Sequence, residues 1–116
     1  MRLLTLNCHS LVESDYEKKV ELFCRGVGRM KPHVIALQEV NQTIEACPFY
    51  NPSTADGPPP FTQGRHYCGY PLRYDNHILR VRELLKKQGL NYNFVWRGMK
   101  EGYGRYEEGL GLLTRD

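Results

Sequence analysis

An acidic and an amide side chain stand where two predicted strands end. Glu39 follows an apolar run at residues 34–37, and Asn7 ends a leucine-rich run at residues 2–7. In α/β proteins, ligands bind and catalysis occurs at the carboxyl ends of the strands. Parallel neighbouring strands would bring Asn7 and Glu39 to the same edge of the sheet. The sequence therefore predicts one site that combines a carboxylate with a neutral amide.

The segment between these runs predicts how they are positioned. The run 34–37 is unbroken and holds two β-branched residues, which is typical of a strand covered on both faces. Apolar residues recur at helical spacing over residues 15–30, Ser14 and Glu17 form a capping-box pattern, and Pro32 ends the helix. Strand, helix and strand in this order predict a right-handed βαβ unit with parallel strands.

The second half of the chain starts with a segment in which periodicity fails. Residues 42–74 are rich in proline, glycine and aromatic residues, which predicts a loop bordering the site. Arg65, His66 and Arg73 could meet an anionic substrate there, or be solvated loop charges. A helix capped by Asp75 or Asn76 and stopped at residue 89, a strand at residues 92–96 and an apolar run at residues 110–113 complete the pattern.

Composition restricts the class of protein. The 116 residues are 41% hydrophobic and 25% charged, which is ordinary for one soluble domain. No apolar run approaches the roughly 18 residues of a membrane span, and no signal peptide is evident, so we expect a cytoplasmic protein. The net charge of +3 would not repel an anionic substrate, yet it comes with no polybasic arm. The four cysteines and four histidines lack the spacings of zinc or redox motifs.

Three stretches taken together resemble the endonuclease/exonuclease/phosphatase superfamily, the deoxyribonuclease I-like metal-dependent phosphoesterases. They are Leu-Leu-Thr-Leu-Asn-Cys-His at 3–9, Val-Ile-Ala-Leu-Gln-Glu-Val at 34–40 and Tyr-Glu-Glu-Gly-Leu-Gly-Leu-Leu at 106–113. The family fold is an α/β sandwich of four layers. The resemblance implies that residues 1–116 form a single partial domain, the N-terminal half, with a mixed sheet begun by a parallel βαβ unit and with two helices.

The resemblance also implies a set of site residues. Glu39 would be the ligand of a Mg²⁺ or Mn²⁺ ion. Asn7 would lie beside it and hydrogen-bond the phosphate or a metal-bound water. Glu108 matches the position whose carboxylate orients a catalytic histidine, and Tyr106 would lie close to the scissile phosphate. The implied substrate is a phosphoester, in a nucleic acid, a phosphorylated small molecule or a lipid headgroup.

The chain departs from the family pattern at its end. A later Asp-x-Asn pair and a terminal Asp-His pair have no counterpart before Asp116. We therefore expect this polypeptide to be the N-terminal part of a metal-dependent phosphoesterase, inactive alone. The sheet face that a second sheet would cover is expected to be apolar and to favour self-association.

Two other classes of function compete with this interpretation. The chain could be a small α/β protein-binding module without catalysis, in which Glu39 is incidental and Glu107 and Glu108 are surface charges. A nucleic-acid-binding domain is disfavoured, because the basic residues are not clustered.

Overall fold

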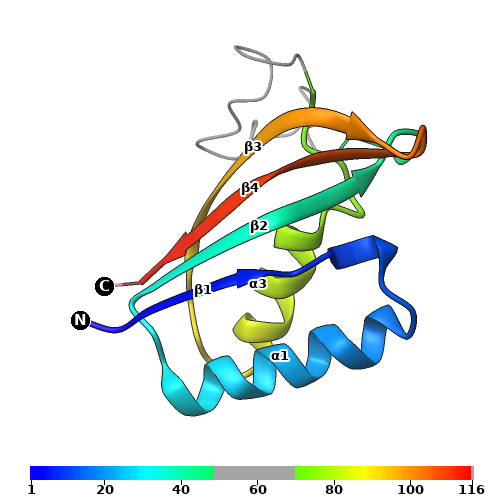
Figure 1. Ribbon diagram of the computed structural model, residues 1–116. Coiled ribbons are helices and arrows are strands. Elements are labelled where there is room, and N and C mark those ends of the chain that lie inside the picture. The colour runs from blue at the N-terminus through cyan, green and yellow to red at the C-terminus, as the bar shows by residue number, and fades with distance from the viewer. Residues whose placement is uncertain (49–69, 116) are drawn as a thin grey trace.

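A mixed sheet with two helices on one face organises the computed structural model, which describes residues 1–48 and 70–115 (Figure 1). The elements in chain order are β1 (Leu3–Asn7), the 3-10 helix η1 (Ser10–Val12), α1 (Tyr16–Met30), β2 (Val34–Thr43), α3 (His77–Lys87), β3 (Asn93–Gly102) and β4 (Tyr106–Thr114). The strand order is β1-β2-β4-β3. β1 and β2 are parallel, and the other two pairs are antiparallel. The predicted α/β class and the parallel βαβ unit are confirmed.

Helix α1 begins differently from the sequence pattern. Its N-cap is Asp15, which has a positive φ of 52° and makes no side-chain capping bond. The capping box expected from Ser14 and Glu17 is therefore not formed. Glu17 instead pairs with Arg80 of α3 at 2.6 Å, so a tertiary contact takes the carboxylate that the local motif would have used.

Helix α3 has the termini that its sequence predicts. The Asn76 side chain accepts a hydrogen bond from the Ile78 amide at 2.9 Å, which satisfies one of the free N–H groups of the first turn. Gly89 follows the helix with a φ of 80°, a conformation that glycine adopts without steric cost. Of the helices in the described ranges, none has the length and apolar character that a membrane crossing requires.

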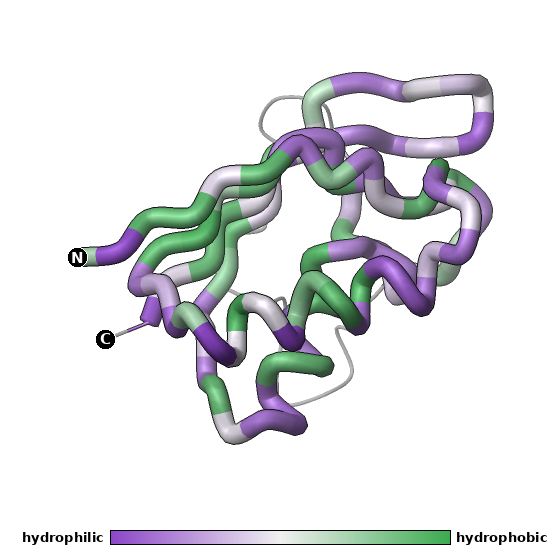
Figure 2. The backbone as a smooth tube through the Cα atoms, turned by 60° about the horizontal axis from the view of Figure 1, so that its bottom comes forward, coloured by the Kyte–Doolittle hydropathy of each residue, from purple (hydrophilic) through white to green (hydrophobic). Residues whose placement is uncertain are grey.

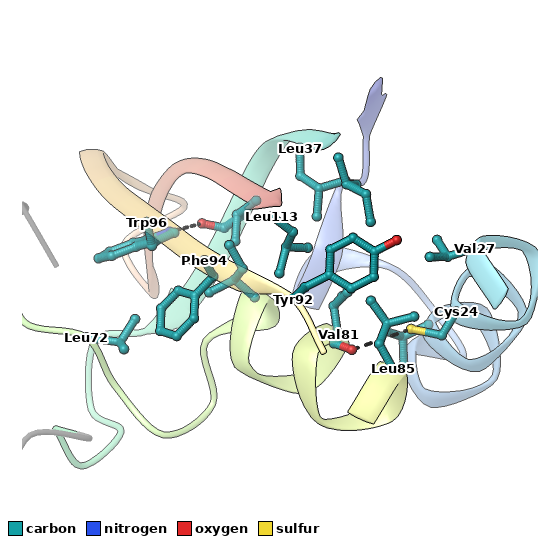
Figure 3. Packing of buried hydrophobic residues seen from close by; sticks show 14 residues of the cluster. Cys24, Val27, Leu37, Leu72, Val81, Leu85, Tyr92, Phe94, Trp96 and Leu113 are labelled. Carbon is teal, nitrogen blue, oxygen red and sulfur yellow. Dashed lines mark hydrogen bonds between the residues drawn. The ribbon is translucent and has the colours of Figure 1, made fainter. Parts of the chain in front are cut away.

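The hydrophobic core lies between the helices and one face of the sheet (Figure 3). Trp96 of β3 is fully buried, and its indole Nε1 donates to the Val40 carbonyl across β4 at 3.1 Å. This reach needs a glycine on β4, because a Cβ at Gly109 would lie 2.8 Å from that indole nitrogen and 2.3 Å from the Arg97 carbonyl oxygen. The glycine of the third sequence stretch thus allows Trp96 of β3 to reach the Val40 carbonyl on β2.

Each of the long strands β2, β3 and β4 has an apolar half and a polar half. The apolar parts lie toward the end of the sheet that carries both termini, and the β3–β4 hairpin at the opposite end is hydrophilic (Figure 2). The face turned away from the helices keeps leucines in solvent: Leu3, Leu110 and Leu112 are 67%, 48% and 38% exposed. The sheet therefore has a polar end and an uncovered apolar face.

The segment 42–74 was expected to be a loop, and its described residues, 42–48 and 70–74, make several backbone contacts. β2 continues into it as far as Thr43. At its base Pro48 and Arg73 form an antiparallel bridge, and the Tyr74 amide donates to the Cys47 carbonyl at 2.9 Å. Arg65 and His66 lie outside the described residues. Residues 47–48 and 73–74 are thus held side by side.

Candidate functional site

Glu39 lies in a bulge of β2, not at the strand end that the sequence predicted. Leu37 pairs with Gly111 and Val40 with Gly109, so Gln38 and Glu39 together face a single residue of β4. Glu39 has a φ of 54°, in the left-handed region. Bulges re-aim side chains and are common beside active sites. A non-glycine residue in this conformation costs about 1–2 kcal/mol, so the surrounding contacts must hold it there.

The parallel strands bring Asn7 next to this bulge. Asn7 pairs with Gln38, the residue before Glu39, so the amide and the acid lie on neighbouring strands at the same end of the sheet. The following residue, Cys8, lies close enough to Glu39 for the carboxylate to affect its pKa. Burial raises the pKa of the Cys8 thiol to about 12, and the negative charge of Glu39 contributes to the same shift. The strand pairing expected from the sequence, with Asn7 opposite the residue before Glu39, is present.

Glu108 and Tyr106 flank the bulge from the other side. β4 pairs with β2 on the edge opposite to β1, where Glu108 faces Asn41 and Tyr106 faces Thr43. The Glu108 side chain is 18% exposed and lies 3.7 Å from the Lys100 ammonium group. The four residues predicted from the sequence therefore come from three adjacent strands around the polar half of β2.

Glu107, which could have been a surface charge, is buried. Its carboxylate accepts from Arg73 Nε at 2.8 Å and from Gln42 Nε2 at 2.7 Å. Arg73, a candidate for substrate contact, is thus engaged in an ion pair inside the protein. Successive side chains of β4 alternate between the two faces of the sheet, and Glu107 shares its face with Gly109 and the buried Leu113. This alternation could have predicted that Glu107 is buried.

A pocket of about 230 Å³ opens beside Asn7, between β1, η1 and α1. Its lining includes Cys8, Tyr16, Phe23 and His77. His77 Nδ1 lies 2.8 Å from the Tyr16 hydroxyl, and Nε2 has no hydrogen-bond partner among the described residues. Burial lowers the pKa of His77 to about 4. His77 is therefore a neutral imidazole at physiological pH.

The oxygen donors of Glu39 and Asn7 suit one kind of metal site. Within residues 1–48 and 70–115, no three His, Cys, Asp or Glu side chains group closely enough to hold a metal. Mg²⁺, however, takes one or two protein carboxylates, keeps several waters and accepts oxygen from a substrate phosphate. One carboxylate from Glu39 and one amide oxygen from Asn7 fit that pattern. They do not fit a structural zinc site, which needs four protein ligands.

The backbone at Glu39 leads to a stability prediction. Glu39→Gly is expected to be more stable than Glu39→Ala by about 1 kcal/mol, because glycine has no Cβ to clash at positive φ. Glu39→Asn should lie between them, since asparagine tolerates this region better than alanine. Urea unfolding of the three variants measures the order. An alanine variant as stable as the glycine variant would show that the strain is absent in solution.

One of three comparisons with known proteins finds a match to the fold of this chain. No family model matches the sequence, and no curated protein matches it. A solved structure does, an endonuclease/exonuclease/phosphatase family protein from Leptotrichia buccalis C-1013-b, with a TM-score of 0.78 and 25% sequence identity. The match covers 98% of this chain and 36% of that chain, so this chain spans about a third of the length of the protein it resembles. The likeness found in three sequence stretches is thereby confirmed in structure: the chain has the fold of the N-terminal portion of the endonuclease/exonuclease/phosphatase family.

Proposed function

We propose that the chain supplies the metal-binding part of a divalent-metal-dependent phosphoesterase. The observation that carries the proposal is the strained bulge at Glu39, which lies on the strand next to Asn7. The fold match to the N-terminal portion of a family of phosphoesterases supports the same interpretation. The substrate class is a phosphodiester or phosphomonoester, in a nucleic acid, a phosphorylated small molecule or a lipid headgroup.

In this proposal each residue has a distinct task. Glu39 holds Mg²⁺ or Mn²⁺, which when bound neutralises charge that develops on the phosphoryl oxygens. Asn7 donates a hydrogen bond to a phosphate oxygen, and its neutral amide avoids the repulsion that a second carboxylate would exert on the phosphate. Tyr106 would contact the scissile phosphate, and Glu108 would orient a catalytic histidine.

Metal binding tests the proposal without requiring turnover. Mg²⁺ is titrated into residues 1–116 while the amide resonances of Asn7 and Glu39 are followed by NMR. Outer-shell groups alone contribute about ten- to a hundredfold to metal affinity, so Glu39→Gln should weaken binding by at least about a hundredfold. Glu21→Gln, which removes an exposed carboxylate from α1, is the matched control and should bind as the wild type does. Equal Mg²⁺ affinity in the Glu39 and Glu21 variants would refute the metal site.

Catalysis by residues 1–116 alone is not expected, because the Asp-x-Asn and Asp-His pairs of the family pattern have no counterpart in the sequence. With bis-p-nitrophenyl phosphate and Mg²⁺, the chain should show no hydrolysis that depends on Glu39. Robust hydrolysis abolished by Glu39→Ala would mean that the residues present suffice.

The uncovered sheet face favours a second candidate, a protein-binding module. Its exposed leucines, from the edge strand β1 and the central strand β4, lie on the face that carries no helix. In this alternative the apolar face binds another protein and Glu39 has no catalytic task. Absence of metal binding together with tight association through this face would favour it over the phosphoesterase.

Self-association through this face is the outcome we expect for the isolated chain. Leu112→Lys places a charge at the centre of the face and should shift a concentration-dependent dimer to monomer. Leu22→Lys is the matched control, because Leu22 is an equally large residue, 53% exposed, on helix α1. Sedimentation velocity over a hundredfold range of concentration measures the effect. A wild-type chain that stays monomeric, or two variants that behave alike, would contradict it.

A further inference from the structure

The residue that follows β1 contacts both residues of the bulge. The Cys8 amide donates to the Gln38 carbonyl at 3.1 Å, and the Cys8 thiol donates to the same oxygen at 3.0 Å. The Glu39 carbonyl lies 3.6 Å from the sulfur, within hydrogen-bond range for a thiol. The single thiol proton of Cys8 therefore lies within reach of both carbonyl groups of the bulge, and the Cys8 amide also donates to the one at Gln38.

Ser10 holds the other side of the bulge. Its hydroxyl oxygen accepts a hydrogen bond from the Asn41 amide at 2.9 Å, and the residue is 1% exposed. Ser10 has a positive φ of 40°, so the chain turns sharply after β1 to bring this oxygen to β2. The bulge is thus bracketed by the segment that also carries Asn7.

We infer that Cys8 is a positioning residue for the metal site, acting through the backbone of Gln38 and Glu39; this rests on the proposed function. Without the thiol, the peptide at Glu39 loses contacts that offset its left-handed conformation. Strand side chains alternate between faces, so a bulge that slips or straightens redirects the Glu39 carboxylate. The sulfur therefore sets where the acid points, whereas Asn7 is placed by the strand itself.

Cys24 provides a matched control. It is a second thiol in the described part of the chain, 1% exposed, and its sulfur lies 3.9 Å from the Val81 carbonyl in the helix-packed core. Truncating either cysteine to alanine removes one sulfur that contacts a backbone carbonyl. A purely structural role predicts that both variants lose stability and keep their metal affinity. A positioning role predicts that the two variants differ in Mg²⁺ affinity.

The experiment compares Cys8→Ala, Cys8→Ser, Cys24→Ala and Glu39→Gln in residues 1–116, with Mg²⁺ affinity from NMR titration and stability from urea unfolding. Cys8→Ala should weaken Mg²⁺ binding about tenfold, as expected for an outer-shell contact. Cys8→Ser, which keeps a donor, should recover most of that loss. Cys24→Ala should lose stability only. Ser10→Ala adds an independent readout, faster hydrogen exchange at the Asn41 amide.

The outcomes separate this inference from the function on which it rests. If Glu39→Gln abolishes Mg²⁺ binding and Cys8→Ala binds as the wild type does, the positioning role is overturned and the metal site stands. If Cys8→Ser is no better than Cys8→Ala, a hydrogen bond from the side chain is not the cause, and the inference fails. If Glu39→Gln leaves Mg²⁺ binding unchanged, both proposals are overturned.

Discussion

Replacing Arg73 with methionine is expected to lower the free energy of unfolding by about 3–5 kcal/mol, the cost of leaving one partner of a buried ion pair uncompensated. The pair joins the residues before α3 to β4, with Arg73 Nε 2.8 Å from the Glu107 carboxylate and side chains only 16% and 5% exposed. Arg73 also donates to the Ala46 carbonyl at 2.8 Å, so its replacement removes a second contact, between the residues before α3 and those after β2. Urea unfolding measures the change.

A matched substitution and a double variant make this prediction specific. Arg25→Met removes an exposed arginine from α1 and should change stability by less than about 0.5 kcal/mol. Arg73→Met combined with Glu107→Leu should recover much of the loss, because an apolar pair leaves no buried charge without a partner. A loss below about 1 kcal/mol for Arg73→Met alone would show that the ion pair is solvated.

Acidification is expected to destabilise the protein through His77. Burial lowers the pKa of His77 to about 4 in the folded state, against about 6.5 in the unfolded chain. The unfolded chain thus binds this proton first, so the contribution is fully present above pH 6.5 and is lost as pH falls from 6.5 toward 4. A shift of this size corresponds to about 3 kcal/mol.

The test removes the titrating group and keeps a polar side chain. The difference in unfolding free energy between wild type and His77→Gln should narrow by about 3 kcal/mol between pH 7 and pH 4. Parallel pH profiles for the wild type and His77→Gln would mean that the imidazole is protonated within the folded protein.

Local sequence signals account for the elements that position the site. The apolar runs of β1 and β2 and the periodicity of α1 are short-range patterns, and they correctly predicted the parallel pair that brings Asn7 beside Glu39. The Asn76 cap also depends only on neighbouring residues. Such features can be predicted because their causes lie within a few residues along the chain.

The features that sequence reasoning missed arise from contacts between distant segments. The bulge at Glu39 is a mismatch in register between β2 and β4, about 70 residues apart, and no local pattern encodes it. Glu107 can be buried because Arg73 and Gln42 donate hydrogen bonds to its carboxylate. The capping box at α1 failed for the same reason, since Arg80 of α3 binds Glu17. In each case a tertiary partner outweighed a local preference.

The bridge between Pro48 and Arg73 fixes the distance that the intervening chain must span. Closing a longer loop costs little once its ends are fixed, about 0.6 kcal/mol for each doubling of length. Lengthening the chain between Pro48 and Arg73 is therefore expected to cost little free energy of unfolding.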